Sequence, residues 1–206
     1  MTRLARFLCD RKAASAVEFA LVAPLVFLFI FGMIDAGRYM WQVNQAEKAT
    51  QMGVRYAVAT DPVATPLTSY SFAVTDAATA GLPVPTANFD TATCDNSSCT
   101  CTSTTGNFCT QVNNAANYNA TAFSNIVAQV RKRFRPVTAS NVVVDYRNIG
   151  LGFAGNPTGA DVAALVTVKL SGVHFHPIMF FGGGSINLPT IQSSLTLEDA
   201  AGNVSN

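Results

Sequence analysis

The sequence has little charge and few of the side chains that carry out catalysis. Only 12% of its 206 residues are Asp, Glu, Lys or Arg, and it contains two histidines and one tryptophan. It has no serine in a G-x-S-x-G setting, no paired Cys and His arrangement and no carboxylate cluster of recognisable spacing. These absences argue against an enzyme, so we expect no catalytic, cofactor-binding or metal-binding residues.

Basic residues are scarce beyond the N-terminus, which argues against a nucleic-acid-binding surface. The first 13 residues carry a net charge of +3 from four basic side chains and one acidic one, whereas the rest of the chain carries −2. The later basic group within 131–135 fits a solvated helix end better than a DNA site. A basic N-terminus ahead of an apolar run follows the positive-inside pattern, so we expect residues 1–13 in the cytoplasm and the chain after the run outside.

A long apolar stretch near the N-terminus lacks charge. Phe19 to Ile34 is a run of 16 uncharged residues, roughly 24 Å as a helix, which is short for a hydrocarbon core of about 30 Å. A helix that begins at Ala13 has 22 residues and spans roughly 33 Å, but it includes Glu18. An ionised carboxylate in lipid costs on the order of 2.5 to 3.5 kcal/mol, so Glu18 either has a partner or lies at headgroup level near Lys12. A secretory signal peptide would carry its small residues after the apolar run, whereas "AASA" precedes it.

A helical pattern continues beyond this run. Small and apolar residues recur at steps of three and four from Ala36 to Ala57, with polar residues between them, and this predicts an amphipathic helix. We therefore predict one helix over 14–60, with a membrane span at about 14–34 and an amphipathic continuation at 35–60. Pro24 should kink the helix or leave a gap in its hydrogen bonds, and Asp61-Pro62 should end it.

The basic leader, the small residues and the run "AVEFALVAPLVFLFIFGMIDAGR" together resemble the type IV pilin class, most closely the TadE-like minor pseudopilins of the tight-adherence (Tad, Flp) pilus. In that class a prepilin peptidase cuts on the cytoplasmic side, and glutamate is fifth in the mature chain. Counting back from Glu18 places the cut between Ala13 and Ala14, with alanine where the family usually has glycine. The resemblance implies that Glu18 meets the N-terminus of a neighbouring subunit, and that the apolar run packs against neighbouring helices through Phe19, Leu21, Pro24, Leu25 and Leu28.

The resemblance also implies a function and a location. A minor pseudopilin takes part in assembly of a Tad-type (type IVc) pilus used in adhesion, biofilm formation and surface colonisation. It would be a single-pass protein of the bacterial inner membrane, with its N-terminus in the cytoplasm and its C-terminal domain in the periplasm, and would enter the extracellular pilus. Its partners would be the prepilin peptidase, other Tad minor pilins, the major Flp pilin and the assembly platform, with no nucleic acid and no cofactor. The alternative is a single-span anchored protein with an extracytoplasmic ligand-binding or enzymatic domain.

Cysteine usage agrees with an extracytoplasmic domain. One of the five cysteines lies in the predicted leader, and the remaining four lie where disulfides can form: Cys94, Cys99, Cys101 and Cys109. A bridge across "CTC" would be strained, so we expect Cys94 to pair with Cys99 or Cys101, and Cys109 to pair with the other. A metal site is the alternative for four thiols, but the spacing lacks the C-x2-C pairs of zinc ribbons. We expect the disulfides to staple an irregular insertion over 61–119.

The C-terminal part has helix and strand patterns. A helix is predicted over 120–134, and β-branched or alternating segments predict strands within 141–149, 160–176 and 185–199, with a break at Gly172. We therefore predict an α+β, pilin-like fold in which the long helix packs on an antiparallel sheet, with residues 61–206 as the extracytoplasmic globular domain.

Three motifs in this part resemble ligand sites and are interpreted as ordinary structure. "GLGFAG" at 150–155 matches G-x-G-x-x-G, but no helix pattern follows it, so we predict a hairpin loop. His174 and His176 would share a strand face without a third ligand nearby. "FFGGGS" at 180–185 lacks the Gly-Lys-Ser/Thr ending of a phosphate-binding loop and is predicted to be a turn between strands.

Overall fold

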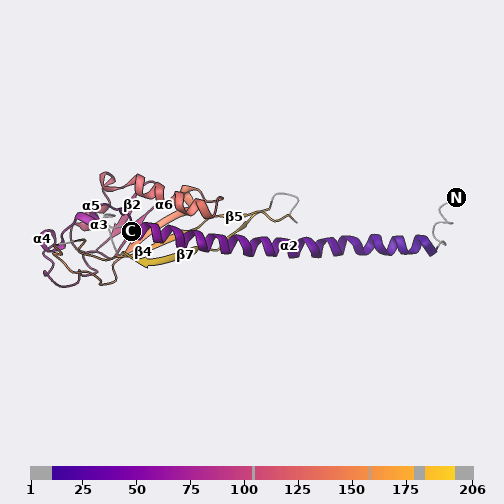
Figure 1. The fold of residues 1–206 in the computed structure, drawn as a ribbon, viewed down its shortest axis with the longest axis horizontal. Coiled ribbons are helices and arrows are strands. Elements are labelled where there is room, and N and C mark those ends of the chain that lie inside the picture. Colours follow the sequence, from indigo (N-terminus) through magenta and orange to yellow (C-terminus); the bar gives the residue numbers. More distant parts are fainter. Residues whose placement is uncertain (1–10, 104, 158, 179–183, 198–206) are drawn as a thin grey trace. The chain divides into compact units, whose positions relative to one another are not determined.

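The structure is a computed structural model of the chain and describes residues 11–103, 105–157, 159–178 and 184–197, with side chains from residue 15 onward (Figure 1). The chain divides into two compact units. The first, which we call the stem unit, comprises Met1–Gln42 and His174–Ile186. The second, the globular unit, comprises Val43–Val173 and Asn187–Asn206.

A single helix, α2 (Arg11–Val58), runs through 48 residues and contributes to both units. It continues through Pro24 without a break in the helical assignment, although Pro24 has no N–H to donate to the carbonyl four residues earlier. The helix ends at Val58, three residues before the Asp61-Pro62 pair that was predicted to stop it. The long N-terminal helix predicted from periodicity is therefore confirmed.

The globular unit is built on a five-stranded sheet in which every neighbouring pair is antiparallel. The spatial order is β2 (Cys99–Thr102), β1 (Thr91–Cys94), β3 (Val142–Arg147), β4 (Leu165–Leu170) and β7 (Ile191–Thr196). Strands β3 and β4, in the interior of the sheet, are buried over most of their length, as expected for strands that are covered on both faces. The predicted α+β fold with an antiparallel sheet is confirmed.

The second half of α2 packs on this sheet within the globular unit. Its buried positions are mostly small, and Gly53 allows the closest approach: a Cβ built there would lie 2.7 Å from Val130 Cγ2 and 3.4 Å from Val168 Cγ1. The hydroxyl of Thr50 is hydrogen-bonded to that of Ser193 on β7 at 2.9 Å. Small side chains at these positions let the helix lie close to both β4 and the helix α6 (Ala120–Arg133).

Helix α6 (Ala120–Arg133) forms where the amphipathic pattern predicts it. The side chain of Asn119 caps its start by accepting a hydrogen bond from the Ala122 N–H at 3.0 Å. Its apolar face is buried through Phe123, Ile126, Val127 and Val130. The helix ends one residue earlier than predicted, because Phe134 adopts an extended conformation two residues before Pro136.

The segment 61–119, predicted to be an irregular insertion, differs from that expectation. It supplies strands β1 and β2 of the main sheet and several short helices: α3 (Pro66–Ser69), α4 (Phe72–Thr75), α5 (Phe108–Val112) and the 3-10 turn η1 (Ala115–Asn117). The strands read TATC and CTCT, without the run of Val, Ile or aromatic residues that marks a strand. β1 is held by pairing with β3, β2 pairs with β1, and disulfides link both to their surroundings.

This segment also carries an aromatic cluster of its own. The ring of Phe108 lies 5.2 Å from that of Tyr70, 5.0 Å from that of Phe72 and 4.7 Å from that of Phe89. The three phenylalanines are at most 2% exposed. Burial of this size stabilises a core by kilocalories per side chain, so residues 61–119 form part of the folded unit rather than a surface loop.

The glycine-rich segments behave as loops where the structure describes them. No helix opens in the loop at 150–155, and Gly152 has φ +89 with the Asp161 carbonyl oxygen 2.5 Å from where a Cβ would be, so only glycine fits there. Gly172, with φ +66, separates β4 from β5 (His174–Phe175), which forms a two-stranded sheet with β6 (Ile186–Asn187). Most of the "FFGGGS" segment lies outside the described residues.

The remaining 3-10 turn, η2 (Ala139–Asn141), leads into β3.

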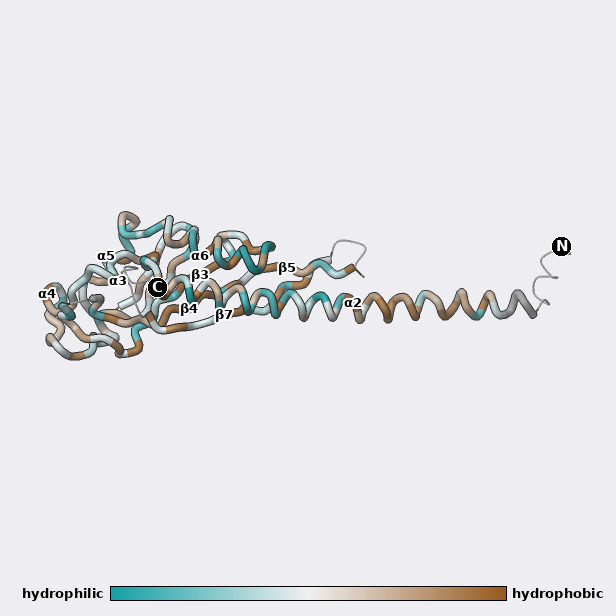
Figure 2. The backbone as a smooth tube through the Cα atoms, viewed as in Figure 1, coloured by the Kyte–Doolittle hydropathy of each residue, from teal (hydrophilic) through white to brown (hydrophobic). Residues whose placement is uncertain are grey.

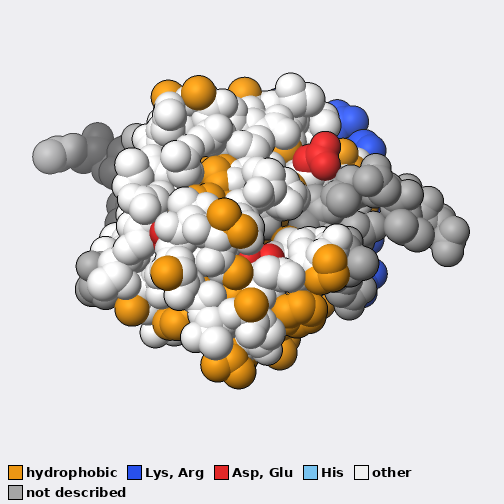
Figure 3. All heavy atoms as spheres, turned by 90° about the vertical axis from the view of Figure 1, so that its left-hand side faces the viewer, with side chains coloured by type: hydrophobic (Ala, Val, Ile, Leu, Met, Phe, Trp, Pro, Cys, Tyr) orange, Lys and Arg blue, Asp and Glu red, His pale blue; other side chains and the backbone are white. Residues whose placement is uncertain are grey.

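Charged side chains are sparse on the loop-bearing face of the globular unit, where scattered hydrophobic side chains lie among polar ones (Figure 3). This distribution agrees with the low charged fraction of the sequence, 12%.

Candidate functional site

The first half of α2 forms the candidate site, and its main feature is that large apolar side chains are exposed. We call residues 15–34 the stem. The stem is the most hydrophobic stretch of the helix (Figure 2), and the helix is long and apolar enough to cross a membrane, with no residue buried in its most apolar window. The exposed fractions at the predicted packing positions are 72% for Phe19, 75% for Leu21, 68% for Leu25 and 57% for Leu28.

Glu18 is the only charged residue of the stem, and it is exposed. Among the side chains that the structure describes, none forms an ion pair with it. Ala13 and Ala14, the residues on either side of the predicted cut, lie within the first turns of α2. The cleavage between them and the role of Glu18 in assembly stay predictions.

A buried carboxylate marks the end of the stem, and the sequence analysis missed it. Asp35 is 7% exposed; its Oδ1 lies 2.9 Å from Arg38 Nη1 and accepts a hydrogen bond from the Ile178 backbone N–H at 2.9 Å. Only the pair of opposite charges three residues apart is visible in the sequence. The third partner lies 143 residues away and has no sequence signal.

An aromatic contact joins the same two segments of the stem unit. The ring of Phe175 on β5 meets Tyr39 edge-to-face at 5.5 Å, and the Arg38 guanidinium carbon lies 5.3 Å from the centre of the Phe175 ring. Strands β5 and β6 form a hairpin, and beside these contacts, between the hairpin and α2, is a cavity of about 330 Å³. It is lined by Gly32, Asp35, Ala36, Tyr39 and Met40 of α2 and by Phe175, Pro177 and Ile186 of the hairpin. The hairpin β5–β6 is therefore attached to α2 just beyond the stem.

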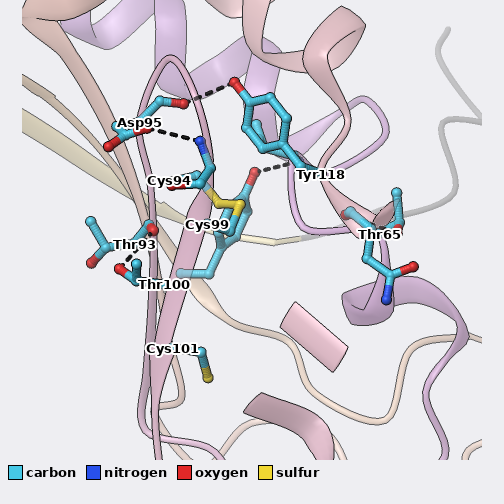
Figure 4. The surroundings of a disulfide bond; sticks show 12 residues. Thr65, Thr93, Cys94, Asp95, Cys99, Thr100, Cys101 and Tyr118 are labelled. Carbon is cyan, nitrogen blue, oxygen red and sulfur yellow. Dashed lines mark hydrogen bonds between the residues drawn. A yellow bond between two sulfur atoms is a disulfide. The ribbon is translucent and has the colours of Figure 1, made fainter. Parts of the chain in front are cut away.

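The four cysteines of the globular unit form two disulfides. Cys94 is bonded to Cys99 across the β1–β2 turn, and Cys101 is bonded to Cys109 at the start of α5, so the structure has one of the two pairings that the sequence left open. Around the first disulfide, the Tyr118 hydroxyl donates a hydrogen bond to the Asp95 carbonyl oxygen at 2.9 Å (Figure 4). The disulfide-stapled region expected in this fold is present.

Hydrogen bonds shift the pKa of Asp95 in the β1–β2 turn, and burial shifts the pKa of the neighbouring Tyr118. Hydrogen bonds from Ser97 and Ser98 to the Asp95 carboxylate lower its pKa, with the Ser97 side chain as the largest cause. Burial raises the pKa of Tyr118, and the negative charge of Asp95 adds to this. At neutral pH the charged Asp95 carboxylate therefore accepts hydrogen bonds from Ser97 and Ser98, and the neutral Tyr118 hydroxyl donates one to the Asp95 carbonyl oxygen.

The outer edge of β2 is occupied by a side chain. The Cys101 N–H donates to Asn113 Oδ1 at 2.7 Å, and Asn113 Nδ2 donates to the Cys101 carbonyl oxygen at 3.4 Å. The carboxamide therefore takes the place that the backbone of a further strand would take.

The two histidines do not gather further ligands in the described part of the chain. His174 and His176 are both exposed, and no group of three or more His, Cys, Asp or Glu side chains with metal-binding geometry occurs among the described residues. The exposed stem is therefore the feature that bears most directly on function.

Taken together, the geometry defines a class of protein in which one apolar helix projects unpaired hydrophobic side chains and continues into an α+β domain with disulfides. Residues 13–55 match the family described as TadE-like protein, and this range takes in the stem and most of the rest of α2. The predicted resemblance is thereby confirmed for this segment. The comparison with curated proteins found no match, and neither did the comparison with solved structures.

The TadE-like match over residues 13–55 supports an association with the Tad pilus system and with a membrane. The TadE-like family is a pilus component rather than an enzyme. Within the described residues, one helix is long and apolar enough to cross a membrane, and this is consistent with a single-pass membrane anchor in such a protein.

Proposed function

We propose that this chain is a minor pseudopilin that takes part in the assembly of a Tad-type pilus used in adhesion and surface colonisation. It is held in the inner membrane by the stem, with the globular unit in the periplasm, and it is processed by a prepilin peptidase. It then associates with other Tad minor pilins, the major Flp pilin and the assembly platform. The observation that carries the proposal is the stem: it lies within the TadE-like match and leaves its large apolar side chains exposed.

The stem can exchange one apolar environment for another. In the membrane, Phe19, Leu21 and Leu25 contact lipid; in a helical bundle the same side chains contact neighbouring stems. Because lipid tails are as apolar as leucine, this exchange gains mainly van der Waals packing and little hydrophobic free energy. Extraction from the bilayer therefore needs work from the assembly machinery.

Glu18 gives the exchange a direction. Cleavage between Ala13 and Ala14 creates an α-amino group, and the carboxylate of Glu18 on one stem pairs with that amine on the next. Opposite charges attract strongly at low dielectric, but desolvation offsets much of the gain. The pair therefore sets the register and orientation of neighbouring stems more than it adds to their stability.

The cleavage is tested by intact-mass measurement of the protein extracted from membranes of cells with and without the peptidase. We expect a chain that begins at Ala14 only where the peptidase is active. Ala13→Gly restores the residue usual in the family and should raise the processed fraction. A full-length chain in cells that have an active peptidase and build pili would refute the proposal and favour a plain membrane anchor.

The assembly role is tested by Glu18→Ala, with Glu47→Ala as the matched control. Both substitutions remove an exposed carboxylate from α2, but Glu47 lies outside the stem, in the globular unit. We expect Glu18→Ala to insert in the membrane normally and to enter sheared pili at a strongly reduced level, while Glu47→Ala enters at the wild-type level. Equal amounts of the two variants in the pilus fraction would contradict the role of Glu18.

A further inference from the structure

We propose that the β5–β6 hairpin is a second membrane contact, which lies with residues 32–41 of α2 in the lipid headgroup and upper acyl region at the outer end of the stem. The surface consists of the described hairpin residues 174–178 and 184–186 and this stretch of helix, all within the stem unit. The occupant is the lipid leaflet itself. The inference rests on the membrane location in the proposed function and extends it to a part of the chain outside the TadE-like match.

The first argument is that the charge at the end of the stem is covered. Asp35 would ordinarily fix the membrane boundary, because an exposed carboxylate stays in water. Here it is 7% exposed and satisfied by Arg38 and by the Ile178 N–H, both at 2.9 Å. The Arg38 side chain is long enough to keep its guanidinium at the interface while its methylene groups lie along apolar surface. The boundary is therefore free to lie beyond Asp35.

The second argument is that exposed apolar surface continues past Asp35. Met40 is 61% exposed and Trp41 is 62% exposed, and they lie five and six residues after Asp35, about 8 to 9 Å along a helix. Tryptophan and tyrosine favour the level of the headgroups, where one side of the ring is apolar and the other can reach water. The helix thus presents an interfacial surface directly continuous with the stem.

The third argument is that the hairpin adds to this surface at the same level. The hydrogen bond from Ile178 to Asp35 and the contact of Phe175 with Tyr39 place the hairpin beside residues 35–39 of α2. Ile178 is 43% exposed and Ile186 is 45% exposed. The described hairpin residues include no Asp, Glu, Lys or Arg, so no carboxylate, ammonium or guanidinium among them opposes contact with lipid. The two exposed histidines, His174 and His176, are their only ionisable side chains.

The cavity between hairpin and helix fits the same occupant. It measures about 330 Å³, and apart from Asp35 its lining is apolar or aromatic. Such a groove, open to the surface that continues from the stem, suits the end of an acyl chain rather than a polar ligand. A soluble partner protein would require this surface to lie clear of the bilayer, whereas the hydrogen bond of Asp35 with Ile178 holds it at the end of the span.

Tryptophan quenching by brominated lipids tests the proposal with the full-length chain in vesicles of brominated phosphatidylcholine. Trp41 is the only tryptophan, so its fluorescence reports the helix directly. A double variant, W41F with I178W, moves the only tryptophan to the hairpin. A matched control, W41F with F153W, places it in the globular unit at a position 41% exposed, close to the 43% of Ile178.

We expect wild type and I178W to be quenched to a similar extent, and several-fold more than F153W. Quenching of I178W no greater than that of F153W would overturn the proposal. Adding Asp35→Ala to the I178W variant should reduce its quenching, because the Ile178 N–H then loses its acceptor; unchanged quenching would show that Asp35 does not hold the hairpin in lipid and would contradict that step. The readout does not depend on pili, so failure here is distinguishable from failure of the assembly role, which Glu18→Ala measures.

Discussion

The two halves of α2 solve opposite problems with the same backbone. In the stem the large side chains of Phe19, Leu21 and Leu25 are more than two-thirds exposed, whereas in the globular unit the helix buries Ala49 and Ala57 completely. Small residues let a helix approach a sheet closely, whereas large exposed ones provide contact area for lipid or for a helix of another molecule. Hydrophobic residues in this helix therefore do not all belong to the core. In α2 the small ones pack inside the globular unit, and the large ones of the stem stay exposed.

The sharpest way to break this comparison is to place the same large side chain on α2 once in the stem unit and once in the globular unit. Gly53→Leu should lower the free energy of unfolding of the globular unit by about 3 kcal/mol, since its first added carbon already lies 2.7 Å from Val130. Gly37→Leu is the control, because nothing lies within 4 Å of a Cβ at that position. Urea unfolding of the detergent-solubilised chain, followed by the near-ultraviolet circular dichroism of buried aromatic side chains, measures both. Equal destabilisation would contradict the close packing at Gly53.

The second disulfide, between Cys101 and Cys109, should stabilise the globular unit without affecting the stem. Replacing Cys101 and Cys109 together by serine opens a loop with a sequence separation of 8 and should lower the free energy of unfolding by roughly 2.5 kcal/mol. The same unfolding measurement, with and without reductant, tests this. Membrane insertion, measured by flotation with vesicles, should be unchanged because the stem does not depend on the bond. Loss of flotation would mean that the two halves fold together.

A buried hydroxyl sharpens the comparison further. Tyr146 is fully buried and accepts a hydrogen bond from the Val63 N–H at 3.0 Å. Tyr146→Phe leaves that donor unpaired and should lower the free energy of unfolding by about 1.5 kcal/mol. If the substitution is neutral, the hydrogen bond contributes nothing net.

The same residue predicts a dependence on pH. Burial raises the pKa of the Tyr146 hydroxyl, and the Val63 N–H lowers it by less. Above about pH 10 the unfolded chain loses this proton while the native chain keeps it, so native stability should be intact below pH 10 and should fall as the pH rises further. Tyr146→Phe should flatten this alkaline decline, and an unchanged slope from wild type to variant would rule out Tyr146 as its source.

The smallest effect is expected in the stem. Leu25→Ala removes a side chain that is 68% exposed and should change the unfolding of the globular unit by less than about 0.5 kcal/mol. Val54→Ala, at a position 2% exposed in the other half of the helix, should cost on the order of 1 to 3 kcal/mol. Parallel unfolding curves for these two truncations give the most direct comparison of the two halves.

The parts of the fold that could be predicted from sequence are those with local signals. A 16-residue run without charge, from Phe19 to Ile34, and helical periodicity beyond it predict α2, and the apolar spacing from Phe123 to Val130 predicts α6. Strand β3 is rich in valine and pairs with β4, whose β-branched character was also visible. In these elements, local propensity and tertiary packing favour the same conformation.

The parts that were missed depend on distant partners. Strands β1 and β2 have weak local propensity, and β1 is held to β3 across more than 40 residues of chain by pairs such as Cys94 with Val144. The contact of Asp35 with Ile178 likewise joins residues with no common pattern. Glu18, Ala13 and Ala14 are the converse case: the family motif identifies them, and the roles proposed for them involve a peptidase or another subunit rather than a contact within the chain.

The carboxamide of Asn113 on the rim of β2 has a consequence for life in a crowded compartment. An open strand rim invites backbone pairing with any extended peptide, including a second copy of the same chain, and this is a common route to insoluble aggregates. By filling both the donor and the acceptor at Cys101, one asparagine discourages such growth from that side of the sheet. In the proposed assembly, subunits concentrated on a membrane would then associate through their apolar helices without pairing between their sheets.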